Sequence, residues 1–126
     1  INILSPHLNM SERVVLGLIE NIVLLNNNQE EKVTARIDTG ATTSSIDLNL
    51  AEKLGLKVSD KEKIVKSASG IEKRHMVFAR VKIKDLMIED YFTLADRHHM
   101  TYSVLIGQNI LKQGEFIVDP LKEENQ

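Results

Sequence analysis

The stretch RIDTGATTS, residues 36–44, decides the fold that we expect for this chain. It follows a run in which Val33, Ala35 and Ile37 alternate with polar residues, which is the period-2 pattern of a half-buried strand. The strand therefore delivers Asp38 to a turn made of a hydroxyl residue, a glycine and a small residue. Taken alone, an Asp-Thr-Gly turn is a weak signal, and an ordinary structural turn remains the alternative.

A second stretch, VLIGQNIL at residues 104–111, favours a functional turn at Asp38 over an ordinary structural one. The apolar residues before Gly107 are typical of a buried strand, and residues 109–111 begin a helical pattern. We expect this strand to pack beneath the turn that carries Asp38. In the turn itself, Gly40 permits another backbone segment to approach closely, and backbone N–H donors can hold the Asp38 carboxylate.

The remaining pattern predicts short strands joined by turns. Residues 14–25 are expected to form two short strands or one bent strand, with a buried helix as the alternative. A short helix that carries Leu50, Ala51 and Leu54 on one side is expected, capped by Asp47 and ended by Gly55. Further strands are expected at residues 63–66, 71–83, 86–94, 102–106 and 115–118, with a hairpin tip at 67–70, a turn at 84–85 and a short helix at 108–112.

Together these elements predict an all-β fold, a small closed or strongly twisted β-barrel with one or two short helices and a β-hairpin flap. The 126 residues fit one domain, residues 1–126, with its core at residues 13–120. We therefore expect one hydrophobic core and no second independent domain.

The composition excludes several classes of function. The chain has no cysteine, so disulfide scaffolds, thiolate zinc sites and cysteine nucleophiles are ruled out, and a reducing cytoplasm is permitted. Its net charge of −2 gives no general attraction to nucleic acid or anionic membranes. Residues 14–25 are too short for a membrane-spanning helix, and no signal peptide is visible, although the chain begins at Ile1 and a targeting segment upstream would be invisible. We expect a cytoplasmic protein with no nucleic-acid or membrane partner.

The order of these stretches resembles that of retropepsin-like aspartic peptidases over residues 13–120. Within that superfamily the chain is most similar to a prokaryotic group labelled ATP-dependent zinc proteases, often associated with ATP-grasp ligases that append glutamate. The narrower likeness rests on three stretches: Lys66 and Ser67 with Gly70 and Arg74, residues 92–94 with Asp96 and Arg97, and residues 104–111 with 118–120. The resemblance implies a barrel with a flap and a peptidase without a metal ion or other cofactor.

The resemblance also assigns the site. It implies a catalytic loop of Asp38, Thr39 and Gly40, in which Thr39 can hydrogen-bond across to a partner's loop. The substrate-binding residues that it implies are Ala41, Lys66, Ser67, Gly70 and Arg74.

One Asp-Thr-Gly in so short a chain supplies half of a carboxylate pair. The second Asp38 must come from a symmetric homodimer, in which each subunit gives the same loop. Two close carboxylates share a proton, so one acts as general base on a water and the other hydrogen-bonds the carbonyl of a peptide substrate. Gln108 stands where the family commonly has an arginine, and Thr42 and Thr43 stand where viral enzymes have aspartates. We therefore expect weak or concentration-dependent dimerisation.

Two other functions remain as alternatives. A zinc-dependent peptidase would need ligands such as His75, His98 and His99, but adjacent histidines in a strand point to opposite faces and no H-E-x-x-H spacing is present. We expect a polar loop at His98 and His99 and a solvated position for His75. A non-catalytic dimeric peptide-binding module is the second alternative. The intact Asp38 argues against it, and Gln108 mildly favours it.

Basic residues around the expected flap indicate an acidic peptide substrate, including glutamate-rich tails added by a ligase. Lys66, Lys73 and Arg74 flank the hairpin tip, and a solvated strand arm is the alternative. A one-residue shift in hairpin register exchanges its faces, so the sequence does not settle which of the three points inward. For the neighbouring residues Asp96 and Arg97 we expect a structural salt bridge at a strand end, with a functional pair as the alternative.

Overall fold

The computed structural model describes residues 7–68 and 70–123; the side chain of Ser67 lies outside the described part. A 3-10 turn (η1, Met10–Glu12) comes first. The strands are β1 (Val15–Leu16), β2 (Ile19–Asn26), β3 (Gln29–Ile37), β4 (Ser44–Asp47), β5 (Val58–Ser67), β6 (Gly70–Ile83), β7 (Leu86–Ala95), β8 (Val104–Ile106) and β9 (Ile117–Val118), and the helices are α1 (Leu48–Lys53) and α2 (Gln108–Gln113).

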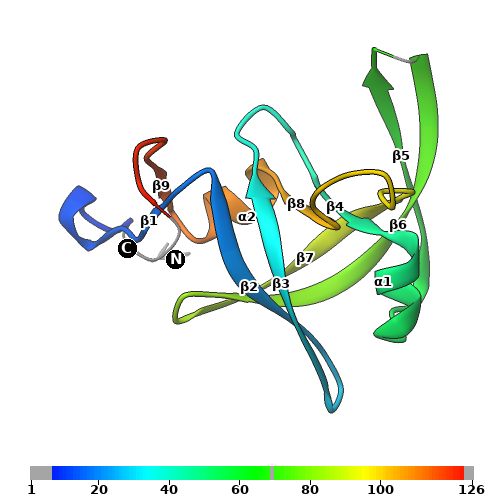
Figure 1. Cartoon of the computed structure of the whole chain (residues 1–126), viewed down its shortest axis with the longest axis horizontal. Coiled ribbons are helices and arrows are strands. Elements are labelled where there is room, and N and C mark those ends of the chain that lie inside the picture. The colour runs from blue at the N-terminus through cyan, green and yellow to red at the C-terminus, as the bar shows by residue number, and fades with distance from the viewer. Residues whose placement is uncertain (1–6, 69, 124–126) are drawn as a thin grey trace, which may run out of the picture.

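Six strands close into a barrel (Figure 1). The sheet order is β2-β3-β8-β4-β7-β6-β5, and β2 also pairs with β6, which closes the ring and leaves β5 outside it. Closure removes the unpaired edges that β2 and β6 would otherwise expose. The predicted all-β barrel with two short helices is confirmed.

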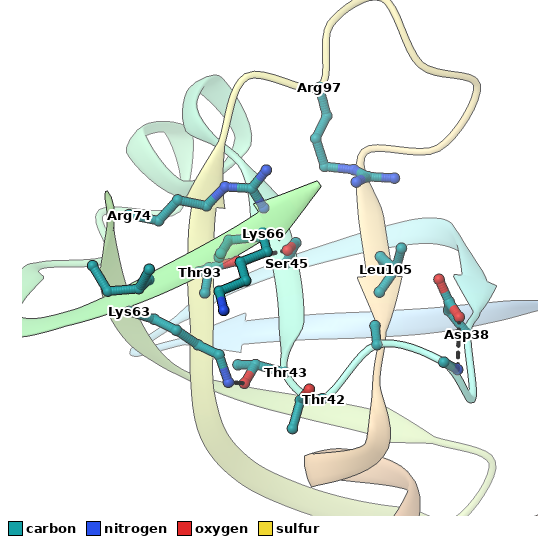
Figure 2. A pocket seen from close by; sticks show the side chains of 14 residues that line it. Asp38, Thr42, Thr43, Ser45, Lys63, Lys66, Arg74, Thr93, Arg97 and Leu105 are labelled. Carbon is teal, nitrogen blue, oxygen red and sulfur yellow. Dashed lines mark hydrogen bonds between the residues drawn. The ribbon is translucent and has the colours of Figure 1, made fainter. Parts of the chain in front are cut away.

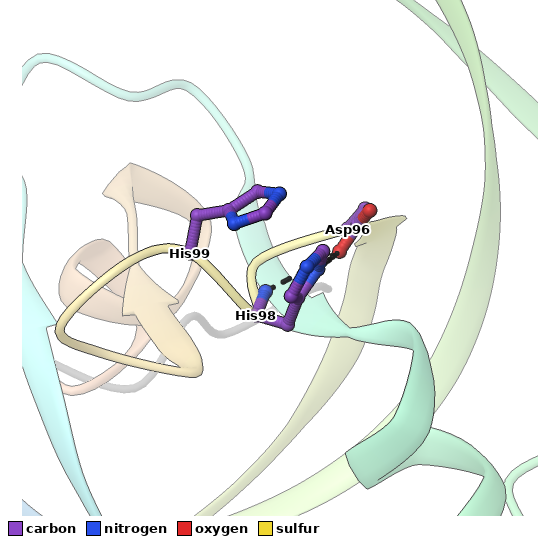
Figure 3. Close-up of side chains that lie close together, drawn as sticks. All are labelled: Asp96, His98 and His99. Atoms are coloured by element: carbon purple, nitrogen blue, oxygen red, sulfur yellow. Dashed lines mark hydrogen bonds and ion pairs between the residues drawn. The ribbon is translucent and has the colours of Figure 1, made fainter.

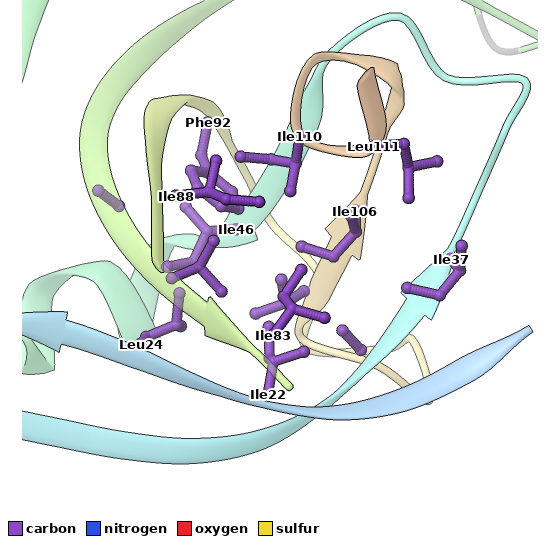
Figure 4. Packing of buried hydrophobic residues seen from close by; sticks show 14 of the residues in the cluster. Ile22, Leu24, Ile37, Ile46, Ile83, Ile88, Phe92, Ile106, Ile110 and Leu111 are labelled. Carbon is purple, nitrogen blue, oxygen red and sulfur yellow. The ribbon is translucent and has the colours of Figure 1, made fainter. Parts of the chain in front are cut away.

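The core lies inside this ring. Alternate residues of the strands point inward, as in β2, where Ile22 and Leu24 are buried and the residues between them are less so. From α2, Ile110 and Leu111 point back toward the strands and close one end of the core (Figure 4). Each fully buried aliphatic side chain of this kind contributes about 1.5–3 kcal/mol relative to an exposed one.

The flap is a long hairpin formed by β5 and the first half of β6. Residues 70–75 are mostly exposed, whereas from Met76 onward β6 alternates between buried and exposed positions as it enters the barrel wall. In Figure 1 the free end of this hairpin projects away from the barrel, on the side opposite the chain termini. The first arm of the hairpin was expected at residues 63–66, but β5 already begins at Val58. A bulge between Val58 and Glu62 interrupts the pairing with β6, which continues on both sides of it.

Helix α1 begins and ends as its sequence predicts. The Asp47 Oδ2 atom accepts hydrogen bonds from the backbone nitrogens of Asn49 (3.1 Å) and Leu50 (3.4 Å). Gly55 follows the helix with φ of +69°, a conformation that glycine adopts without penalty.

Two predicted strands are shorter than expected. The strand expected at residues 115–118 begins only at Ile117, because Glu115 has φ of +52° and breaks the extended run. It pairs in parallel with β1, with Val15 opposite Ile117, and so brings the two ends of the described chain together. The strand expected at residues 102–106 begins at Val104.

A buried carboxylate ties this end of the barrel together. Glu20 is fully buried and accepts hydrogen bonds from Gly17 N (2.7 Å) and Lys122 Nζ (2.9 Å), and Lys84 Nζ lies 3.1 Å away. Burial alone would raise the pKa of Glu20, but these donors outweigh burial and the pKa lies below its ordinary value. Among the described residues, no helix is long and apolar enough to span a bilayer.

Candidate active site

Asp38 lies where β3 leaves the barrel wall. Its backbone nitrogen donates to the carbonyl of Ile106 at 2.9 Å, which extends the parallel pairing of β3 with β8 by one residue. The half-buried carboxylate accepts a hydrogen bond through Oδ1 from the nitrogen of Gly40 at 2.9 Å. Oδ2 makes no hydrogen bond within the described residues, and Figure 2 shows the carboxylate at the edge of a pocket. The loop therefore presents one carboxylate oxygen for chemistry.

Gly107 lets the loop close against the start of α2. A Cβ atom at this position would lie 2.8 Å from the carbonyl oxygen of Ala41 and 2.8 Å from the carbonyl carbon of Thr43. That space is occupied by backbone, which cannot rotate away. The nitrogen of Gln108 also donates to the Ala41 carbonyl at 2.8 Å. The predicted packing of the apolar strand beneath the catalytic loop is present.

A buried polar chain supports the same junction. Ser44 Oγ accepts from Gly107 N at 2.9 Å and donates to Asn109 Oδ1 at 2.8 Å. The other end of the Asn109 side chain donates to the carbonyl of Tyr91 at 2.9 Å. Because each polar group in this series of hydrogen bonds has a partner, the bonds hold the loop, β4, β7 and α2 in one arrangement.

Thr39 points to a different face from Asp38. It is exposed, its hydroxyl makes no hydrogen bond to any part of the chain that is described, and it lines a second pocket with Gln108 and Phe116. Its carbonyl accepts a hydrogen bond from Gln108 Nε2 at 2.8 Å. Gln108 thus binds the 38–41 loop of its own chain, at the position where an arginine would be expected.

The pocket beside Asp38 has a volume of about 770 Å³ and lies between the catalytic loop and the flap (Figure 2). Asp38 is the one acid among the described residues that line it. Its basic residues are Lys63, Lys66, Arg74 and Arg97. Such a lining favours a ligand that carries negative charge.

The expected site residues are brought together only in part. Ala41, Lys66 and Arg74 line the pocket with Asp38 and Gly40. Lys73 is not among the lining residues, which assigns the inward face of this arm to Arg74. Ser67 and Gly70 pair with each other at the flap tip, and the side chain of Ser67 lies outside the described part.

Two basic residues of the lining, Lys63 and Arg97, were not among the substrate-binding residues expected from the sequence. Lys63 reaches from β5 to donate to Thr43 Oγ1 at 2.5 Å, which links the flap arm to the end of the catalytic loop. Arg97 enters from the connection between β7 and β8, where its backbone nitrogen donates to Asp47 Oδ1 at 2.8 Å. Neither residue lies near Asp38 in the sequence, so only the closed barrel reveals them.

The expected salt bridge between Asp96 and Arg97 is wrong. Arg97 is buried and donates through Nε to the carbonyl of Tyr102 at 3.0 Å, whereas Asp96 hydrogen-bonds His98. Burial lowers the pKa of Arg97, and the nearby Arg74 guanidinium lowers it further.

Asp96, His98 and His99 form the candidate metal-binding group of the described chain (Figure 3). Each offers a ligand atom within 4.8 Å of the others, and the hydrogen bond from His98 holds the pKa of Asp96 below its usual range. The two histidines were expected to be separated if they lay in a strand; they follow the end of β7 in a turn, and their ring centroids are 3.5 Å apart. All three are exposed, as the predicted polar loop requires, and none lines the Asp38 pocket.

Comparisons with known proteins agree with this geometry. A family model described as gag-polyprotein putative aspartyl protease matches residues 23–113. No curated protein sequence matches the chain.

Solved structures share the fold at low sequence identity. A protein of unknown function (DUF785) from Legionella pneumophila superposes with a TM-score of 0.66 at 20% identity, covering 88% of this chain and 96% of that one. The EIAV protease in complex with the inhibitor HBY-793 gives 0.60 at 16% identity, covering 86% and 93%. The simian foamy virus (mac) protease gives 0.54 at 14% identity, covering 73% and 89%.

Proposed function

We propose that this chain, which belongs to the gag-polyprotein putative aspartyl protease family, is an aspartic peptidase whose active site is completed by a second copy of itself. The observation that carries the proposal is the position of Asp38. Its carboxylate is held by Gly40 N, leaves one oxygen without a partner in the described chain, and borders a pocket that residues of the flap hairpin also line. These are the features required of half an aspartic-peptidase site.

A homodimer follows from the count of carboxylates. Asp38 is the one acid of the described residues at the pocket, and hydrolysis of this kind uses two carboxylates. A two-fold axis next to the catalytic loop would place Asp38 opposite its mate. The exposed Thr39 hydroxyl is then available to the partner's loop. Because Gln108 is engaged with its own subunit, we expect a weak dimer.

The proposed reaction is peptide-bond hydrolysis. The two Asp38 carboxyls hold one proton between them because two adjacent negative charges repel. The ionised carboxylate takes a proton from a water molecule as the water oxygen attacks the carbonyl carbon, and the protonated carboxyl hydrogen-bonds the carbonyl oxygen. The tetrahedral intermediate then collapses, the carbon–nitrogen bond breaks, and a carboxyl returns a proton to the leaving amine. No redox step or co-reactant other than water is needed.

An acidic peptide is the proposed substrate class. Lys63 and Lys66 from β5 and Arg74 from β6 line the pocket and would steer a negatively charged chain toward Asp38. The narrower likeness to the glutamate-ligase-associated group, which remains a prediction, motivates glutamate-rich tails as the first peptides to try. A cytoplasmic location also remains a prediction.

The proposal is tested by comparing wild type with Asp38→Asn on a panel of acidic peptides, with and without a chelator. Asp38→Asn keeps the shape of the side chain and should abolish cleavage, and the chelator should have no effect. Asp85→Asn is a matched control, because Asp85 is exposed in the turn between β6 and β7 and does not line the pocket. Cleavage that survives Asp38→Asn and disappears with the chelator would instead favour the zinc alternative.

The same samples distinguish the proposed peptidase from a peptide-binding module without turnover. That alternative predicts peptide binding without cleavage by wild-type protein at concentrations where sedimentation shows a dimer. The proposed peptidase predicts cleavage under those conditions.

A further inference from the structure

Arg97 is largely buried and has no ion-pair partner among the residues that the structure describes. Only 8% of the residue is exposed, and no carboxylate of the described chain lies within ion-pair distance of its guanidinium. Its Nε atom is used by the Tyr102 carbonyl, which leaves the two terminal nitrogens without a hydrogen bond to described residues. These two nitrogens are not among the fully buried polar atoms, so they open to the pocket, where a guanidinium with free donors can bind an anion.

The surrounding charges do not supply that anion. Arg74 and Arg36 both act against the charge on Arg97. Asp47 is the acid that favours the charge on Arg97 most, but its two carboxylate oxygens already accept from Asn49 N, Leu50 N and Arg97 N. Asp38 favours that charge less.

Other cations of the pocket are already engaged or solvated. Arg74 Nε pairs with Glu72 at 2.7 Å, and Lys63 donates to Thr43. Lys66 is exposed, so water can solvate its ammonium group. Figure 2 shows the Arg97 guanidinium reaching from the connection after β7 toward Leu105, on the pocket wall that also carries Asp38.

We propose that the terminal nitrogens of Arg97 form the subsite that binds a carboxylate of the peptide substrate beside the scissile bond. The inference rests on the proposed peptidase function and deepens it. A guanidinium presents parallel N–H donors that match the two oxygens of a carboxylate, and the Nε bond to Tyr102 fixes the orientation of this fork. The carboxylate can be a glutamate or aspartate side chain or the C-terminal carboxylate of the peptide.

Binding is measured first, so that the test does not depend on turnover. Fluorescence anisotropy of labelled peptides with full-length Asp38→Asn protein compares a glutamate peptide with its glutamine counterpart, and a free C-terminal acid with the amide. In one of these two comparisons we expect the peptide with the carboxylate to bind about tenfold or more tightly than its uncharged counterpart. Whichever pair shows the preference identifies the source of the carboxylate.

Arg97→Gln in the same background should remove that preference. Glutamine retains donors for the Tyr102 carbonyl, and the uncharged peptides should bind within about twofold as before. A merely structural role for Arg97 predicts weaker binding of all peptides by the same factor, which would overturn the inference. Arg36→Gln is the matched control, because Arg36 lies near Arg97 but does not line the pocket. It should leave the preference in place.

Two further results separate this inference from its premise. If Arg97→Gln shifts the monomer–dimer equilibrium in sedimentation and leaves the peptide preference unchanged, Arg97 pairs with the partner subunit and the subsite is wrong. If wild type fails to cleave but Arg97→Gln still abolishes the carboxylate preference, the peptidase proposal fails and the subsite stands.

Discussion

The side-chain amide of Gln108 donates a hydrogen bond to the carbonyl oxygen of Thr39 at 2.8 Å. This bond joins the first residue of α2 to the catalytic loop of the same subunit. Gln108 therefore stabilises the loop of its own chain, whereas an arginine at this position would be expected to pair with an acid that follows the loop. It leaves the exposed Thr39 hydroxyl for a partner subunit.

Replacing Gln108 by glutamate should disturb the loop without unfolding the protein. The carboxylate would place an acceptor opposite the Thr39 carbonyl, and loss of the bond should cost about 1 kcal/mol in unfolding free energy. We expect a several-fold fall in kcat/KM and a small fall in melting temperature. Gln113→Glu is the control, because Gln113 donates to Asp90 at the far end of the same helix. Equal activity losses in both variants would remove the special role of Gln108.

Gly107→Ala should destabilise the protein strongly. The added methyl would meet backbone atoms of Ala41 and Thr43 at 2.8 Å, so the loop or α2 must move. We expect a loss of about 2 kcal/mol or more in urea-unfolding free energy, together with loss of cleavage. Gly55→Ala is the comparison, because it carries a positive φ but no atom closer than 3.7 Å, and it should cost about 1 kcal/mol. A Gly107→Ala protein as stable as wild type would contradict the close contact.

Glu20 should make the fold sensitive to acid. Its folded pKa is lowered, so its contribution to stability is complete above the unfolded carboxyl pKa and is lost as pH falls through the folded pKa. Glu20→Gln should therefore destabilise the protein by about 2 kcal/mol or more at neutral pH and reduce the acid dependence of stability. Urea-unfolding midpoints over a pH series measure both effects. Glu30→Gln, an exposed change on β3, should alter neither.

The cluster of Asp96, His98 and His99 should not be needed for hydrolysis. None of the three lines the pocket that contains Asp38. The double substitution of His98 and His99 by asparagine should therefore preserve kcat/KM within about twofold, a change below 0.5 kcal/mol in activation free energy. Loss of cleavage in parallel with loss of bound zinc would contradict this expectation.

The sequence predicts the parts of the site that are local in the chain. Asp38 and its turn follow from strand alternation and one glycine, and the strand before Gly107 follows from an apolar run. Arg97 and Lys63 enter the pocket only because β4, β7 and β8 are neighbours in the sheet and the arms of the flap, β5 and β6, continue the same sheet. No spacing or motif contains that information.

Other features depend on the folded chain in the same way. Adjacent histidines point to opposite faces only in a strand, whereas β7 ends at Ala95 and the following turn brings the ring centroids of His98 and His99 to 3.5 Å. The choice between Lys73 and Arg74 depended on hairpin register, which Lys63 opposite Arg74 now fixes. Only the distances and partners of the folded chain reveal that Arg97 forms no ion pair with a described residue.

The most direct test of a shared site mixes wild-type and Asp38→Asn subunits at constant total concentration, under conditions where subunits exchange. If each active site needs Asp38 from both chains, mixed dimers are inactive and cleavage falls as the square of the wild-type fraction. The account predicts that curve. A linear fall with the wild-type fraction would show that each subunit hydrolyses peptide by itself, and would contradict the central claim.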